Sequence, residues 1–428
     1  MSSAPMFFEE CRALPLVSLT LALPVGAALD PPGKDGLTRV TARMLRRGCR
    51  GMTSAEVEAR IDALGAEVSV DVSQSSVSIN FDVIERSLDD LVDLLVRMLA
   101  EPTFDERELG RLLRESEGEL IEARDNDRSL AVRHFRRAFF EGHPYGRRTA
   151  GQLATLRTIS RDDVVAHFPR MLARHGAHVA IAGSVSEARA RALADRLVEA
   201  LPDGGGPAPA IVAPSPRPGR RLVFVDKPER TQTQIIIGAR GVHPREPSFW
   251  PLVLGTTVFG GTFTSRLMRE VRSKRGWSYG ASARVGYDRQ PDALTVWTFP
   301  AAKDAAACIA LELGLLDTWR DKGVTARELA FVRRYLVRSH AFEIDTAHKR
   351  VGLPLEVALL DLPPTHHSAF VEHVRGVTLE SVQAAVAAHA PHRDLLIAVV
   401  GTHADIGAAV RDAIPDLADA SVVPFDSE

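Results

Sequence analysis

The sequence predicts an α+β protein of two duplicated halves, each an antiparallel-rich sheet with helices packed on one face. The main observation is that three landmarks repeat along the 428 residues: a helix start, a helix cap and a glycine that ends an apolar strand. The paired positions are Arg107 and Arg327, Ser160 and Thr378, and Gly183 and Gly401, separated by 220, 218 and 218 residues. A repeat of this length indicates duplicated domains rather than a solenoid.

A stretch rich in proline and glycine separates the two copies. It runs from Pro202 to Arg220 and has the composition of a linker. We therefore expect an N-terminal α+β half over residues 1–201 and a C-terminal α+β half over residues 221–428, joined by residues 202–220.

Alternation of apolar and polar side chains predicts the strands of the first half. The segments are 17–23 and, as a hairpin with one solvated face, 68–72 and 77–83. An apolar run from His178 predicts a further strand, which ends at Gly183. Helical periodicity over residues 88–99, 106–123 and 130–140 predicts the helices that cover this sheet.

The second half repeats this arrangement. Its expected strands are 221–226, 232–238, 279–287, 293–299 and 395–401, and its long helices are 305–319 and 327–342. Ser160 in the first half and Thr378 in the second are placed to cap the helices that follow them.

Composition and charge exclude several classes of protein. The chain is 45% apolar and 25% charged with a formal net charge of -2, so its overall charge gives no reason to expect binding to nucleic acid or to an anionic membrane. The longest apolar stretch, from Leu14, contains Ser, Thr and two Pro, which argues against a membrane span. Glu9 and Glu10 precede it, whereas a signal peptide begins with basic residues. We expect a soluble, cytoplasmic protein.

Most templates for catalysis or metal binding are absent from the sequence. The three cysteines form no C-x-x-C pair, and neither H-E-x-x-H nor H-x-x-E-H occurs. The pairs His175/His178 and His389/His392 have no carboxylate at helical spacing beside them, which favours ordinary surface histidines. Glu115, Glu119 and Glu122 share one face of an acidic helix, a pattern typical of a solvated face with Glu–Arg pairs.

Two segments are more informative. Residues 38–48 carry four arginines at helical spacing, which taken alone predicts a basic helix with a solvated face. In residues 257–280, Gly260 and Gly261 are expected to open a second basic helix and to let a substrate backbone come close. Arg272 late in that helix and Tyr279 at the start of the next strand are placed to converge. The pattern alone favours a structural role for them, because Arg and Tyr are common at such corners.

From Leu16 to about Val410, the order of these segments resembles the insulinase/pitrilysin-like zinc peptidases, the family that includes mitochondrial processing peptidase and its bacterial relatives. The resemblance is carried by residues 36–48, residues 139–146 (F-F-E-G-H-P-Y-G) and residues 259–279. In the last segment a Gly-rich loop precedes S-R-L, and an arginine is followed seven positions later by a tyrosine, as Arg272 and Tyr279 are. The resemblance implies a processing-peptidase-like fold, catalytic roles for Arg272 and Tyr279, and substrate binding by Gly260, Gly261 and Thr262.

The zinc motif of the family is lost in this chain. Met44, Leu45 and Gly48 match the M-L and glycine that follow the family's H-x-x-E-H. That alignment places Arg39 and Arg43 over the two histidines and Ala42 over the glutamate that activates water, with Glu119 in the region of the third ligand. Because a guanidinium offers no lone pair to zinc, we expect a degenerate site, no metal cofactor in this chain and no peptide hydrolysis by the chain alone.

Several members of this family act as heterodimers in which the subunit without zinc presents its Arg and Tyr to the zinc of its partner. The resemblance therefore implies a non-catalytic subunit that binds peptide as an added strand at a sheet edge, with a homologous zinc-bearing partner. Two alternatives stay open: a structural or assembly component with no part in catalysis, and an inactive homodimeric peptide-binding module. The arginines of residues 38–48 are expected either to pair with carboxylates such as Glu119 or to favour acidic peptides.

Overall fold

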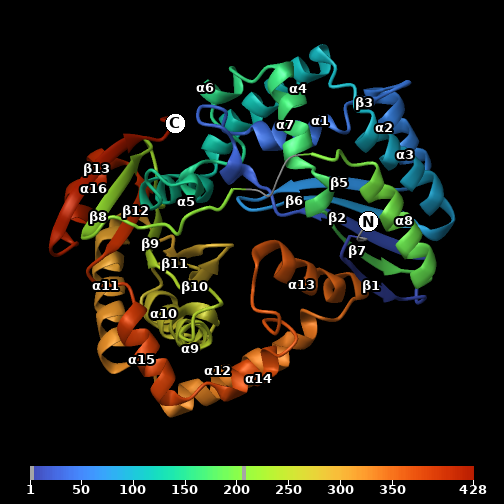
Figure 1. The fold of residues 1–428 in the computed structure, drawn as a ribbon. Helices are drawn as coiled ribbons and strands as arrows, with labels where there is room; N and C mark the ends of the chain where they lie inside the picture. Colours follow the sequence, from blue (N-terminus) through green and yellow to red (C-terminus); the bar gives the residue numbers. More distant parts are fainter. Residues whose placement is uncertain (1–3, 205–208) are drawn as a thin grey trace. The chain divides into compact units, whose positions relative to one another are not determined.

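The computed structural model describes residues 4–204 and 209–428, which form two compact units (Figure 1). The first unit comprises the described residues of Met1–Leu120, Arg147–Ile211 and Ala341–His367. The second unit comprises those of Ile121–Gly146, Val212–His340 and Ser368–Glu428. Each unit thus contains one segment from the other half of the sequence, an exchange that the expected boundaries at 201 and 221 do not include. Residues 205–208 of the expected linker lie outside the described residues.

The first unit is built on a five-stranded sheet with the order β1-β7-β2-β6-β5. Its strands are β1 (Met6–Glu10), β7 (His178–Gly183), β2 (Leu16–Leu23), β6 (Val77–Ile84) and β5 (Glu67–Val72). Only β1 and β7 pair in parallel, and β5 and β6 form the expected antiparallel hairpin. The short strands β3 (Gly48–Cys49) and β4 (Met52–Thr53) form a separate ladder.

Most helices of the first unit pack on one face of this sheet. They are α1 (Leu37–Met44), α2 (Ser54–Ala63), α3 (Leu88–Ala100), α4 (Glu106–Glu122), α6 (Leu153–Leu156), α7 (Arg161–Met171) and α8 (Glu187–Glu199). Leu21 and Ile181 point into this main core, whereas their neighbours Ala22 and Ala182 point to the opposite face. There the small side chains pack against one further helix, α13 (Ala347–Leu360), through residues such as Leu355.

The second unit has a six-stranded sheet with the order β10-β11-β9-β12-β8-β13. The strands are β10 (Ala281–Tyr287), β11 (Pro291–Thr298), β9 (Gln234–Arg240), β12 (Leu395–Gly401), β8 (Arg220–Asp226) and β13 (Leu417–Pro424). The pairs from β10 to β12 are antiparallel, and β8 lies parallel to both β12 and β13. The expectation of an antiparallel-rich sheet in each half is confirmed.

Helices again cover one face of the second sheet, with a single helix on the other. The first group comprises α9 (Phe249–Thr256), α10 (Arg266–Met268), α11 (Ala305–Lys322), α12 (Ala326–Ser339), α14 (Phe370–Gly376), α15 (Leu379–His389) and α16 (His403–Asp412). On the other face α5 (Asp127–Phe139) packs against β8, β9 and β12. Phe135 of α5 fills the space above Gly238, where a Cβ atom would lie 2.3 Å from the ring.

The repeated landmarks have matching structures. Ser160 and Thr378 both form capping boxes, at the starts of α7 and α15. The strands that follow, β7 and β12, both end at the predicted glycines. In the described part of the chain no helix combines the length and the apolar character that crossing a membrane requires.

Candidate functional site

The arginine-rich segment lies on α1 in the first unit. Gly36 caps this helix with a positive φ of 98°, a conformation that favours glycine. Val40, Ala42 and Met44 are fully or almost fully buried in the main core, so one side of the helix is apolar. The prediction of a mainly solvated helix was therefore incomplete: α1 is a core helix with arginines on its other side.

Glu119 of α4 holds the two arginines that replace the family's histidines. Arg39 Nη2 donates to Glu119 Oε2 at 3.0 Å, and Arg43 Nη2 donates to Oε1 at 2.8 Å. Arg43 also donates to Ser116 Oγ at 3.1 Å. Partial burial acts to raise the pKa of Glu119, but hydrogen bonds and charge from the two guanidinium groups outweigh it and lower the pKa below its ordinary value. The expected pairing with Glu119 is confirmed.

The remaining arginines of the segment are paired as well. Arg46 Nη2 donates to Glu58 Oε2 at 2.6 Å, and Arg47 forms an ion pair with Glu115. With Arg39 and Arg43 they line a cavity of about 500 Å³. Because every one of these guanidinium groups has a carboxylate partner, the cavity attracts anions less than its arginine content suggests.

The residues at the zinc helix do not fit a metal ion. The two positions that should coordinate zinc carry cations, and the carboxylate of Glu119 is already occupied by hydrogen bonds from both of them. In residues 4–204 and 209–428, no group of three or more His, Cys, Asp or Glu side chains is arranged to hold a metal ion.

The Gly-rich segment of the second unit differs from its prediction. Gly260 and Gly261 do not open a helix; they end a π-helical extension of α9 that spans Thr257–Gly261. A Cβ atom on buried Gly260 would lie 2.6 Å from Ala283 of β10, so glycine is required there for packing against the strand. Gly261 is exposed, and partly exposed Thr262 lines a cavity.

The next helix begins at Arg266, capped by Ser265, and continues from α10 into a second π-helical turn, Arg269–Ser273, that carries Arg272. Gly276, with φ of 67°, makes the expected turn. The strand β10 starts at Ala281, so Tyr279 lies just before it rather than in its first position. Single π-helical turns are rare and are frequently found at functional sites.

Arg272 and Tyr279 converge as expected. The guanidinium carbon lies 4.3 Å from the centre of the Tyr279 ring and 4.6 Å from that of Phe263. Both rings are largely exposed, at 77% for Tyr279 and 69% for Phe263. Among the described residues Arg272 has no ion-pair partner, although nearby Lys274 and Arg275 both pair with Glu270. Phe263 was missed by the sequence reasoning, and its only signal was an aromatic residue inside the Gly-rich loop.

Two family descriptions match this chain. "Insulinase (Peptidase family M16)" matches residues 11–152, which include α1, and "Peptidase M16 inactive domain" matches residues 158–336, which include Arg272 and Tyr279. The chain belongs to the insulinase (M16) peptidase family. Because the zinc-binding positions of α1 carry arginines and alanine, it is a non-catalytic member of that family.

Individual relatives cover nearly the whole chain. The "Non-peptidase homolog YmxG" of Helicobacter pylori is 19% identical over 400 residues, which is 93% of this chain and 92% of the relative. An uncharacterized zinc protease of Mycobacterium bovis is 25% identical over 412 residues, covering 92% and 90%. The crystal structure of a peptidase M16 inactive domain from Pseudomonas fluorescens has a TM-score of 0.85 at 23% identity, covering 93% of this chain and 96% of that one. The last similarity establishes the fold.

Proposed function

We propose that this chain is the non-catalytic subunit of a two-chain zinc metallopeptidase and that it binds the peptide through Arg272 and Tyr279. The observation that carries the proposal is that the Arg272 guanidinium is oriented by ring contacts but, among the described residues, not neutralised by an ion pair. The guanidinium contacts two exposed aromatic rings and, within the described residues, has no carboxylate partner. An uncompensated, oriented cation of this kind is suited to receive a ligand.

The donors of Arg272 are available to a ligand. Among the described residues its guanidinium N–H groups make no hydrogen bond, so they can donate to an oxygen atom of a bound peptide. The Tyr279 hydroxyl is a second donor on the same surface. Hydrolysis of a peptide builds negative charge on the carbonyl oxygen, and donors already aimed at that oxygen stabilise it. The metal and the attacking water would be supplied by the partner subunit.

The loop from Gly260 to Thr262 would guide the peptide backbone. It packs against β10, which is the edge strand of the second sheet. A peptide added to an exposed edge gains main-chain hydrogen bonds regardless of its sequence. Its carbonyl groups would then pass close to Tyr279, because this residue lies two positions before the first residue of the strand.

A peptide-binding or assembly role without any part in catalysis is the second candidate. The similarity to a protein named as a non-peptidase homolog favours it. This candidate shares the peptide surface but predicts that Arg272 and Tyr279 affect binding alone.

The test is a purified complex of this chain with a zinc-bearing family member that carries H-x-x-E-H, taken from the same organism. We expect Arg272→Ala and Tyr279→Phe to lower kcat by about a hundredfold each, since loss of one such donor costs about 3 kcal/mol. Arg411→Ala, an exposed arginine on α16, is the matched control and should leave kcat unchanged.

Two results would separate the candidates. Unchanged kcat in both variants, in a complex that cleaves peptide, contradicts the proposed role. A complex that binds peptide but does not cleave it, although the partner's zinc motif is intact, supports the second candidate.

A further inference from the structure

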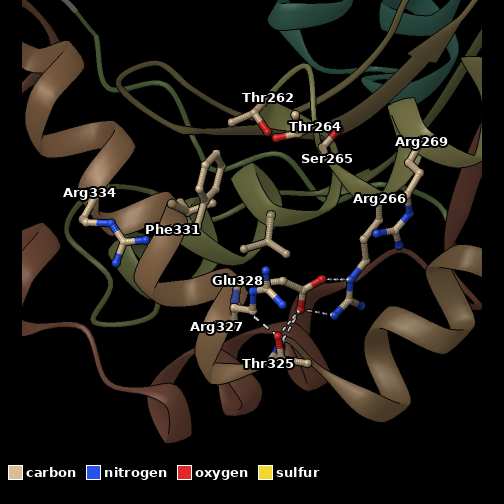
Figure 2. Close-up of a pocket in the computed structure, with 12 residues that line it drawn as sticks. Thr262, Thr264, Ser265, Arg266, Arg269, Thr325, Arg327, Glu328, Phe331 and Arg334 are labelled. Atoms are coloured by element: carbon tan, nitrogen blue, oxygen red, sulfur yellow. Dashed lines mark hydrogen bonds and ion pairs between the residues drawn. The ribbon is translucent and has the colours of Figure 1, made fainter. Parts of the chain in front are cut away.

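A second arginine cluster lies in the second unit, around a cavity of about 590 Å³ (Figure 2). Four arginines line it: Arg266 and Arg269 from the helical segment after the Gly-rich loop, and Arg327 and Arg334 from α12. Glu328 is the only acidic residue in its lining, so the lining carries a formal charge of +3. This is a strong local excess in a chain whose net charge is -2.

Glu328 compensates only one of these arginines. Both of its oxygens accept hydrogen bonds from Arg266, at 2.7 and 2.6 Å, and Oε2 also accepts from the backbone N–H of Thr325 at 2.8 Å. Burial acts to raise the pKa of Glu328, but these donors outweigh it and lower the pKa to about 2. The carboxylate is therefore ionised and fully used by Arg266 and the helix cap.

The other three arginines lack a comparable partner. Arg269 approaches Glu270 only at 3.7 Å, and Glu270 is held more closely by Lys274 at 2.8 Å and Arg275 at 2.9 Å. For Arg327 and Arg334, the part of the chain described by the structure provides no ion pair. These two guanidinium groups are also on exposed residues and can turn toward a ligand.

The arrangement on α12 combines charge with an apolar contact. Arg327, Phe331 and Arg334 are spaced by four and three residues, which places them along one face of the helix. Phe331 is 44% exposed. Figure 2 shows Arg334 and Phe331 on one side of the cavity and Arg266 and Arg269 on the other, with the hydroxyl-bearing residues of the loop above.

The cavity adjoins the Arg272–Tyr279 pair. Its lining includes Thr262 and Thr264, and Phe263 between them contacts the guanidinium of Arg272 at 4.6 Å. The loop residues 262–264 therefore connect the two features, and a peptide bound at Arg272 would lie next to this cavity. The lining of the α1 cavity also contains four arginines and one glutamate, but there each arginine has a glutamate partner, with Glu119 shared by two of them. The cavity in the second unit differs because Arg327 and Arg334 have no ion pair among the described residues.

We propose that this cavity is a specificity subsite for acidic peptides, in which two carboxylates contact Arg327 and Arg334 and an apolar residue between them covers Phe331. That the peptide is a substrate rests on the proposed function, whereas its binding does not. Seven residues of helix separate the arginines by about 10 Å. Five residues of extended peptide span about 13 Å from the first to the fifth and keep their first, third and fifth side chains on one side. The arginine side chains are long and flexible enough to bridge the difference of about 3 Å between these two spacings.

The experiment measures binding of labelled peptides to the full chain by fluorescence anisotropy. The probe contains Glu-Ser-Leu-Ser-Glu, and its uncharged counterpart contains Gln-Ser-Leu-Ser-Gln. We expect the acidic probe to bind at least about tenfold more tightly, with a preference that weakens as salt rises. Arg327→Glu with Arg334→Glu should abolish the preference, Arg327→Gln with Arg334→Gln should reduce it, and the control Arg411→Glu should keep it. Circular dichroism verifies that each variant is folded.

Three results would overturn the subsite: equal affinity of the wild-type chain for both probes, an unchanged preference in the double variants, or displacement of the probe by inorganic phosphate at comparable concentration, which indicates a small-anion site. The Arg272→Ala variant separates this proposal from the previous one. If Arg272→Ala stops cleavage while the double variants keep the acidic preference, only the subsite is wrong. If the preference is lost in the double variants while Arg272→Ala cleaves normally, only the catalytic role is wrong.

Discussion

The buried carboxyl of Glu312 should make the stability of the second unit depend on pH. Glu312 lies on α11 and is fully buried in the core, where the thiol of Cys308 donates to its Oε1 at 3.6 Å. Burial raises the pKa of Glu312 to about 7, although hydrogen bonds from Thr298 and Cys308 act in the opposite direction. The folded chain therefore holds this proton up to neutral pH.

The sign and size of the effect follow from the two pKa values. Because the folded-state pKa is raised above the ordinary 4.5, the stabilisation is complete below pH 4.5 and is lost as pH rises through about 7. The difference corresponds to about 3 kcal/mol, since each tenfold change in proton affinity is worth ~1.4 kcal/mol. Between about pH 5 and about pH 8 the free energy of unfolding should fall by roughly 2.5 kcal/mol from this group.

Urea denaturation followed by tryptophan fluorescence measures this effect selectively. The chain has four tryptophans, Trp250, Trp277, Trp297 and Trp319, and all of them lie in the second unit. Glu312→Gln keeps the shape of the side chain but cannot ionise, so its free energy of unfolding should lack this contribution. The exposed residue Glu372 on α14 supplies the control, Glu372→Gln.

The quantity to compare is the free energy of unfolding of the variant minus that of the wild type, followed as a function of pH. Other groups titrate equally in both chains, so their contributions cancel in this difference. That difference should move in favour of Glu312→Gln by roughly 2.5 kcal/mol between about pH 5 and about pH 8. Parallel pH profiles for wild type and Glu312→Gln would refute the reasoning, as would an equal change in Glu372→Gln.

Two further changes test the first unit. A triple variant that restores the zinc motif, Arg39→His with Ala42→Glu and Arg43→His, should bind one zinc ion, measured by elemental analysis. The reason is that the Glu119 carboxylate already lies within 3.2 Å of the side chains at positions 39 and 43. Adding Glu119→Ala should remove the zinc, and retention of zinc in that variant would contradict the placement of Glu119 as third ligand. Gly183→Ala should lower the free energy of unfolding by about 2 kcal/mol or more, because φ is 135° and the new Cβ would lie 2.1 Å from the Leu16 carbonyl oxygen. Thermal unfolding measured by circular dichroism checks this, and an unchanged midpoint would contradict it.

Local patterns predicted most helices and strands because burial of one face leaves a period in the sequence. The hairpin of β5 and β6 and the capped starts of α7 and α15 were found in this way. The same patterns report that a residue is buried, not which sheet buries it. The helix expected over residues 130–140 was therefore correct as α5, but its place in the second unit was not predictable.

Within the candidate sites, sequence reasoning reached the residues whose spacing is fixed by local structure. The convergence of Arg272 and Tyr279 was expected from their places at the end of a helix and the start of a strand. Their functional role, and the placement of Glu119 in the region of the third ligand, came from the family resemblance. The π-helical turns were not predictable, because one inserted residue hardly changes the helical pattern. The cavity at Arg327 and Arg334 was also missed. Whether an arginine has an ion-pair partner depends on residues distant in the sequence, so two arginines without a partner among the described residues could be recognised only in the three-dimensional structure.

The exchange of α5 and α13 affects how the chain can be divided. A cut in the Pro/Gly-rich linker looks harmless in the sequence, yet it separates each sheet from a helix that covers one of its faces. The N-terminal fragment would lose α13, exposing the small alanines of β2 and β7, and the C-terminal fragment would lose α5. Although the two halves of the sequence repeat the same landmarks, we therefore expect that neither half folds into a stable unit by itself. Domain swaps and split-reporter designs in this fold therefore have to keep both copies together.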